Sequence, residues 1–139
     1  MIIFSKQATI FNQLKTVLIS ASALTAYSKF FQETAELENS LPALLFYIKN
    51  DVPVSNEEQS STGSHTRQLT ITCSILTGIE TLETLETIAD NIYTTIYDTV
   101  EQGTSDNILM VCNPSLNYKF EDTNNYRVAD LAVSILYKV

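Results

Sequence analysis

Glycine, proline and histidine are scarce in this chain of 139 residues, which has three glycines, three prolines and one histidine. The scattered glycines cannot make a phosphate-binding loop, because such a loop needs its glycines within a few residues of one another. The single histidine, His65, lies in a polar segment without a nucleophile-elbow motif, so we expect a solvated side chain there and not a Ser/His/acid site. Long apolar runs are also absent: the longest, residues 43–48, is far short of the roughly 20 residues that span a bilayer.

Cysteine is nearly absent too. Cys73 and Cys112 both lie in apolar, strand-like segments, and their spacing matches no metal-binding motif. Free cysteine is among the most often buried residue types. We therefore expect two buried free thiols, with a disulfide as the alternative if the two strands are neighbours.

Basic residues are missing from the whole stretch of residues 68–118, although the chain has eight of them against sixteen acidic residues and a formal net charge of -8. This acidity argues against direct binding to the phosphate backbone of nucleic acids. Because many acids fall inside the base-free stretch, one side of the protein is expected to be strongly negative. They are Glu80, Glu83, Glu86, Asp90, Asp98, Glu101 and Asp106.

The length and the 45% of hydrophobic residues predict one globular domain over residues 1–139, with a single core. The apolar first residues have no basic region before them. Lys6 and Lys15 also interrupt the place where the core of a secretory signal would lie. We therefore expect a protein that stays in the cytoplasm in which it is made.

Two segments have helical periodicity. In residues 5–20, apolar side chains recur at steps of three and four residues, which predicts an amphipathic helix. In residues 80–102, a wide apolar stripe runs from Leu82 to Val100 and predicts a second helix that packs on a core.

Strands are predicted in pairs around the second helix. Residues 43–49 form a compact apolar strand, and residues 67–78 alternate apolar and polar side chains, as in a strand with one buried face. After the helix, residues 107–120 form a strand that a turn or bulge interrupts at 113–115, and residues 126–139 alternate again.

A short extra strand is placed at residues 26–31, within a segment, 22–38, whose periodicity does not decide between helix and strand. The order is thus helix, strand pair, helix, strand pair. It predicts an α+β domain in which two helices pack on a mixed or antiparallel sheet of about four to five strands.

A long polar segment, residues 50–66, joins the two strands that should form the first hairpin. Loops longer than about 12 to 15 residues are uncommon in compact domains and are usually functional or disordered. We therefore interpret this segment as a protruding arm that contacts a partner. Its candidate contact residues are Asn50, Asp51, Asn56, Glu57, Glu58 and His65, together with Arg67 just after it.

The outer side of the second predicted helix carries only negative charge. No basic residue of the helix compensates, and Glu86 with Asp90 forms a like-charged pair at four-residue spacing. The simplest interpretation is a solvated face. The functional alternative is a surface that meets a basic partner or lines a channel through which phosphates pass. The candidates are Glu83, Glu86, Asp90, Asp98 and Glu101.

No set of residues points to catalysis. Glu121 and Asp122 are adjacent beside a predicted turn, where solvated carboxylates are common. Nothing in the sequence marks a cleft for paired carboxylates or for a metal ion. We expect no enzymatic activity, no cofactor and no metal site.

Taken together, RQLTITCSILTG, LETIADNIYTTIYDTV and YKFED followed by YRVADLAVSILYKV resemble tail terminator proteins of long-tailed bacteriophages. The N-terminal helix and the LPALLFYIK strand fit the same layout, so the resemblance covers most of the chain. It implies a virion protein of the tail-neck region that forms a homo-oligomeric ring, typically a hexamer. Such a ring caps the tail tube protein and presents a surface to the head connector or completion protein. DNA would pass through the lumen without sequence-specific contacts, no membrane is involved, and the family brings no catalytic residues.

Two other interpretations stay open on the sequence. A head-closure or tail-completion protein of the same neck region would share the size and the acidity, and binding to isolated tail tubes or to filled heads separates the two. A small α+β enzyme or ligand-binding domain would hold a deep pocket with convergent polar groups. A ring subunit would instead expose apolar patches that only assembly buries.

Overall fold

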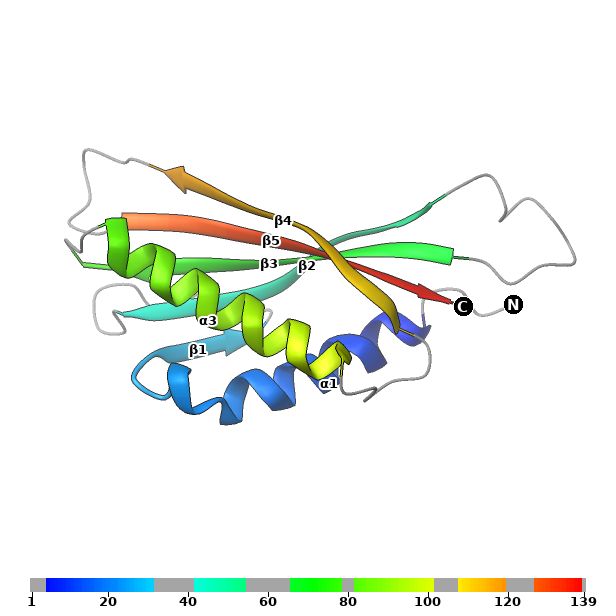
Figure 1. Cartoon of the computed structure of the whole chain (residues 1–139), viewed down its shortest axis with the longest axis horizontal. Coiled ribbons are helices and arrows are strands. Elements are labelled where there is room, and N and C mark those ends of the chain that lie inside the picture. The colour runs from blue at the N-terminus through cyan, green and yellow to red at the C-terminus, as the bar shows by residue number, and fades with distance from the viewer. Residues whose placement is uncertain are drawn as a thin grey trace, which may run out of the picture.

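The strands of this protein form one five-stranded sheet in a computed structural model, which describes residues 5–31, 42–54, 66–78, 82–101, 108–119 and 127–138. The strand order is β1-β2-β3-β5-β4, and both helices lie on the same side of the sheet (Figure 1). The elements are α1 (Ser5–Ser20), the short 3-10 helix η1 (Ser22–Leu24), β1 (Ser28–Phe31), β2 (Ala43–Pro53), β3 (Thr66–Thr77), α3 (Leu82–Glu101), β4 (Ile108–Lys119) and β5 (Arg127–Lys138).

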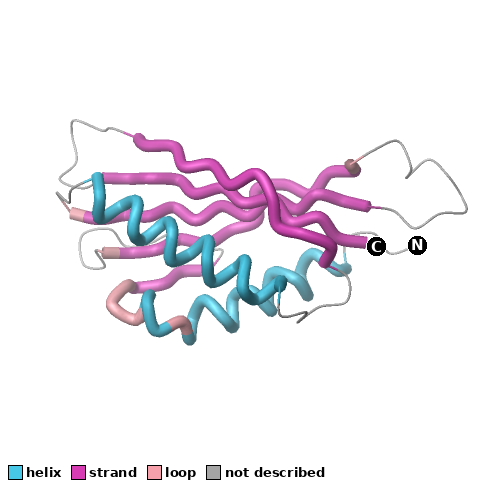
Figure 2. The backbone as a smooth tube through the Cα atoms, viewed as in Figure 1, coloured by secondary structure: helices cyan, strands magenta, loops and turns pink. Residues whose placement is uncertain are grey.

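The predicted α+β class is confirmed. β1 pairs parallel to β2, whereas the other neighbouring pairs are antiparallel, so the sheet is mixed. Figure 2 shows the strands as one continuous, twisted layer with the helices packed against it. The helix predicted over residues 5–20 is α1, and the strand placed at 26–31 is β1, with η1 just before it.

The centre of the core is the pair β3 and β5, which are in register from Thr66 opposite Lys138 to Thr77 opposite Arg127. Because side chains alternate along a strand, one face of this pair is apolar and meets the helices. The predicted burial of this face is confirmed. Its buried residues are Leu69, Ile71, Cys73 and Ile75 on β3 and Ala129, Leu131, Val133, Ile135 and Tyr137 on β5.

The expectation of a single buried face is wrong in the middle of β3. Thr72 and Ser74 belong to the opposite face, yet both are buried as well. β3 is the middle strand of the sheet, so its small side chains lie between those of β2 and β5. Tyr47, for example, is the register partner of Thr72.

The helices cover the apolar face of the sheet. From α1, Ile10, Phe11, Leu14 and Leu18 are buried. The predicted stripe of α3 supplies Leu85, Ile88, Ala89, Ile92 and Ile96 to the same core.

The margin formed by α1 and β1 is held by a chain of aromatic rings. The rings of Phe31 and Phe46 are stacked, with centroids 4.8 Å apart and an interplanar angle of 13°. Phe11 on α1 meets Phe31 edge-on at 6.3 Å and 73°. Offset stacking and edge contacts are the favoured arrangements of aromatic pairs, so these three residues tie β2, β1 and α1 together.

The break predicted within residues 107–120 is a bulge inside one long strand, β4. Its register with β5 shifts between Cys112 and Ser115, and Asn113 has a φ of 51°. Asparagine tolerates this left-handed conformation better than most residues. Both cysteines are free, but only Cys73 is fully buried. Cys112 lies on the outermost strand, and β5 separates the two thiols.

The predicted start of the polar arm is wrong. Asn50 to Pro53 continue β2, and Asp51 lies opposite Leu69 of β3 after a bulge between Ile48 and Asn50. The predicted bounds of the arm, residues 50–66, are therefore too wide at both ends, because β2 extends to Pro53 and β3 begins at Thr66.

Candidate functional site

A buried polar network lies at the end of the sheet where β2 finishes and β3 begins. Arg67 Nε donates a hydrogen bond to Asp51 Oδ1 at 2.8 Å, and Arg67 Nη2 donates to the main-chain carbonyl of Asp51 at 2.9 Å. Tyr137 on β5 donates its hydroxyl hydrogen to Asp51 Oδ2. The side chains of the ion pair are each 4% exposed, so loss of either partner would leave a buried charge.

Strand register brings these three residues together. Arg67 lies opposite Pro53 on β2 and opposite Tyr137 on β5. The start of α1 also reaches this end of the sheet, because Lys6 Nζ donates to the carbonyl of Lys138 at 3.1 Å. The sequence predicts Asp51 and Arg67 as contacts to a partner. In the structure they contact each other and link β2 to β3, the two strands from which the arm leaves.

The network keeps Tyr137 protonated. Its burial, followed by the hydrogen bond to Asp51 and the charge of Asp51, raises the pKa of Tyr137 well above its ordinary value, against a weaker lowering effect of Arg67. In the unfolded chain the phenol titrates near its ordinary pKa of roughly 10. Above that pH the folded state holds a proton that the unfolded state has lost.

This difference predicts an alkaline loss of stability. Between about pH 10 and 12, Tyr137 should lower the free energy of unfolding by up to roughly 1.4 kcal/mol per pH unit. Tyr137→Phe should remove that component, which urea unfolding at several pH values measures. Cys73 also lowers the free energy of unfolding as the pH rises, because burial and then the charge of Asp130 raise the pKa of its thiol. Both proteins share that contribution, so parallel pH profiles would contradict the assignment to Tyr137.

The remaining arm candidates are only partly placed. Asn50 is exposed on β2. The candidates Asn56, Glu57, Glu58 and His65 lie outside the described residues. Their predicted contact with a partner stays a prediction.

The acidic candidates of α3 spread around the exposed side of the helix. Glu86, Asp90, Asp98 and Glu101 are all exposed, whereas the side chain of Glu83 lies outside the described part of the chain. Glu86 is on the side of α3 that faces β4, because burial and then the charge of Glu86 raise the pKa of Tyr118 on that strand. Asp98 is on the other side of the helix, toward α1.

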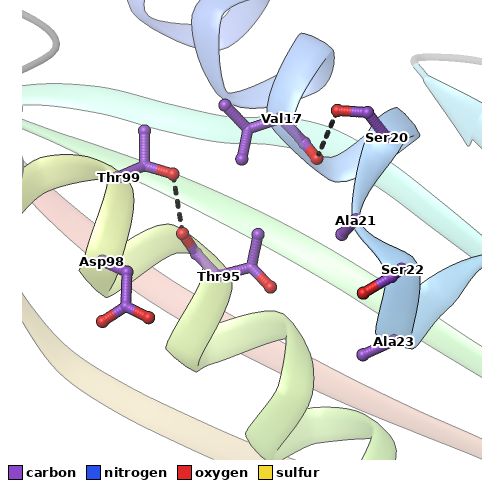
Figure 3. A pocket seen from close by; sticks show the side chains of 8 residues that line it. All are labelled: Val17, Ser20, Ala21, Ser22, Ala23, Thr95, Asp98 and Thr99. Atoms are coloured by element: carbon purple, nitrogen blue, oxygen red, sulfur yellow. Dashed lines mark hydrogen bonds between the residues drawn. The ribbon is translucent and has the colours of Figure 1, made fainter.

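Asp98 lies at a pocket between α3 and the junction of α1 with η1, shown in Figure 3. The pocket is open to solvent and has a volume of about 360 Å³. The hydroxyls of Thr95 and Thr99 donate to carbonyls one turn earlier in α3, at 2.7 Å each, so they offer only acceptor positions to the pocket. The full lining is Val17, Ser20, Ala21, Ser22, Ala23, Thr95, Asp98 and Thr99.

Neither a metal centre nor a membrane span is found among the described residues. No three His, Cys, Asp or Glu side chains in those segments gather where they could hold a metal ion. None of the helices in the same segments is both long and apolar enough to cross a bilayer.

Sequence reasoning does not find the role of Tyr137 in the buried network, and it does not single out the exposed tyrosines of α3 and β4. The alternation of β5 places Tyr137 on the buried face, but it does not reveal Asp51 as its partner. A signal exists, since a buried tyrosine hydroxyl usually finds a hydrogen-bond partner. Tyr97 on α3 and Tyr118 on β4 are 43% and 36% exposed.

No protein-family model matches the chain, and no curated protein matches its sequence. Its fold is similar to that of a chain in the virion of a native gene transfer agent particle, with a TM-score of 0.57 and 12% sequence identity. The similarity covers 94% of this chain and 92% of that chain. At this identity the likeness establishes a shared fold.

Proposed function

We propose that this chain is a structural protein of a phage-like virion, a tail terminator that forms a ring on the end of the tail tube and joins it to the head. The observation that carries the proposal is the fold likeness to a chain of a gene transfer agent virion along nearly the whole of both chains. The resemblance of the sequence to tail terminators selects this role among virion proteins.

In this role the protein acts through its surfaces. The ring contains six copies, as the resemblance implies, and it contacts the tail tube protein on one side and the head connector on the other. The protein is made in the host cytoplasm, ends in the tail-neck region of the virion, and has neither a catalytic residue nor a cofactor. The formal net charge of -8 supports passage of DNA past the ring, because like charge prevents phosphates from binding.

The decisive experiment removes the chain from the particle that contains it. Without a terminator, tubes should grow to irregular, extended lengths and should not join heads, which electron microscopy of the particles measures. Supplying the chain from a plasmid should restore tubes of uniform length. Uniform tubes beside heads that have lost their DNA would contradict this role and would indicate a head-closure protein.

A further inference from the structure

The two edges of the sheet have opposite chemistry. β1 is the strand at one edge and β4 is the strand at the other. α1 lies on the β1 side and α3 on the β4 side, as Figure 1 shows. Each edge strand, with the helix beside it, forms a margin, and the two edge strands lie on opposite sides of the sheet.

The α1/β1 margin is basic and partly apolar. Lys15 Nζ lies over the ring of Phe31, 5.3 Å from its centroid. Lys29 Nζ donates to the carbonyl of Ile19 at 3.0 Å, and the Ile19 side chain is 50% exposed. Residues 5–31 contain lysines but no acidic residue.

The α3/β4 margin is acidic and aromatic. Glu86 is exposed on α3, and burial and then the charge of Glu86 raise the pKa of Tyr118 on β4. The charge of Glu101 and then a hydrogen bond with it raise the pKa of Tyr97, and the charge of Asp98 adds a smaller effect of the same sign. The ring centroids of Tyr97 and Tyr93 are 6.1 Å apart. Residues 68–118 contain no lysine or arginine, so the first base of β4 is Lys119, whose Nζ lies 2.7 Å from Asp130 Oδ2.

These margins are complementary to each other. The lysines of one margin would meet the carboxylates and the tyrosine rings of the other, and tyrosine rings attract cations. The exposed isoleucine would meet exposed tyrosines, and tyrosine is enriched among the contacts that contribute most to binding at interfaces. In the described chain, β1 and β4 also have unpaired outer edges, which proteins usually cover or blunt. A contact between different surfaces on opposite sides of one subunit repeats head to tail and closes into rings.

We infer that the α1/β1 margin of one copy of this chain docks on the α3/β4 margin of the next copy. The inference deepens the proposed function and rests on its ring. The occupant of each margin is a second copy of the chain, with Lys15 and Lys29 facing Glu86 and Glu101 and with Tyr97 and Tyr118 between them.

Charge reversal tests this contact in the full-length chain. The variant E86K/E101K carries lysines at both margins, and the variant K15E/K29E carries acids at both. Each alone should associate at least about tenfold more weakly than the wild type at low salt, because like charges then face each other. An equimolar mixture should assemble again, because the two variants alternate around an even-numbered ring.

Sedimentation velocity measures the mass of each sample against the 15.5 kDa of one chain. The matched control is Lys49→Glu, a charge reversal at an exposed position of β2, which forms neither edge of the sheet, and it should leave assembly unchanged. Circular dichroism checks folding. E86K/E101K should fold, since it relieves the repulsion between Glu86 and Asp90 and places a lysine at the C-terminal end of α3.

Three results would overturn the contact. They are wild-type assembly by E86K/E101K, a mixture of two folded variants that stays monomeric, and a wild-type chain that stays monomeric at its highest soluble concentration. Tube length in the particle is scored separately. If the chain is monomeric but still limits tube length, the interface is wrong and the proposed function stands. If the chain forms normal rings but tubes grow without limit, the proposed function is wrong and the interface stands.

Discussion

Asp51→Ala is expected to lower the free energy of unfolding by about 3 to 5 kcal/mol, because it removes the carboxylate that balances the buried charge of Arg67. The same change removes the acceptor of the Tyr137 hydroxyl. Urea unfolding followed by circular dichroism measures the loss. Asp51 lies near the end of β2, where a polar residue would ordinarily tolerate replacement, so the size of the effect is diagnostic.

The chain contains a second ion pair that serves as the control. Lys119 Nζ lies 2.7 Å from Asp130 Oδ2, but the Lys119 side chain is 58% exposed. Solvent screens such a pair, so Lys119→Ala should change the free energy of unfolding by no more than about 1 kcal/mol. Equal losses for Asp51→Ala and Lys119→Ala would contradict the account of the buried network.

A double variant separates the value of the pair from the penalty of breaking it. Replacing Asp51 and Arg67 together by leucine removes both charges and should cost less than Asp51→Ala alone. Such a protein would also show whether the network fixes the direction in which β2 and β3 leave the sheet. If it folds but no longer limits tube length, the network positions the arm in addition to stabilising the sheet.

Periodicity predicts most of this fold because most of its elements are amphipathic. α1, β3 and β5 each bury one face against a common core, and that requirement appears directly in the spacing of their apolar residues. The C-terminal end of β2 lacks this signal. Asn50, Asp51 and Pro53 are typical turn residues, yet they continue the strand, since Arg67 neutralises Asp51 from the neighbouring strand.

The candidate site is predicted less well than the fold. Asp51 and Arg67 are 16 positions apart and meet only through the register of a hairpin, which composition does not fix. A helical wheel places Asp98 with Glu86 on the outer side of α3. It does not reveal that α1 and β4 both pack against that helix, with Asp98 at the pocket beside α1 and Glu86 acting on Tyr118 of β4.

The other large expected effect concerns the aromatic chain beneath the α1/β1 margin. Phe46→Ala should lower the free energy of unfolding by about 3 to 5 kcal/mol, because Phe46 is fully buried and its removal leaves a cavity under Phe31. Phe46→Leu keeps much of the apolar volume and should cost less. Urea unfolding measures both variants, and equal losses would show that the stacked ring itself contributes nothing.

The same substitution connects the core to assembly. Lys15 lies over Phe31, and Phe31 is held by Phe46, so a cavity at Phe46 should loosen the basic margin as well as the fold. Ile71→Ala is the matched comparison, since it removes a buried side chain from the central strand β3, which is not part of that margin, at a cost of about 2 to 5 kcal/mol. At a temperature where both variants remain folded, Phe46→Ala should weaken self-association more than Ile71→Ala does in sedimentation velocity. Equal weakening would mean that assembly follows global stability and does not depend on how the aromatic chain places Lys15.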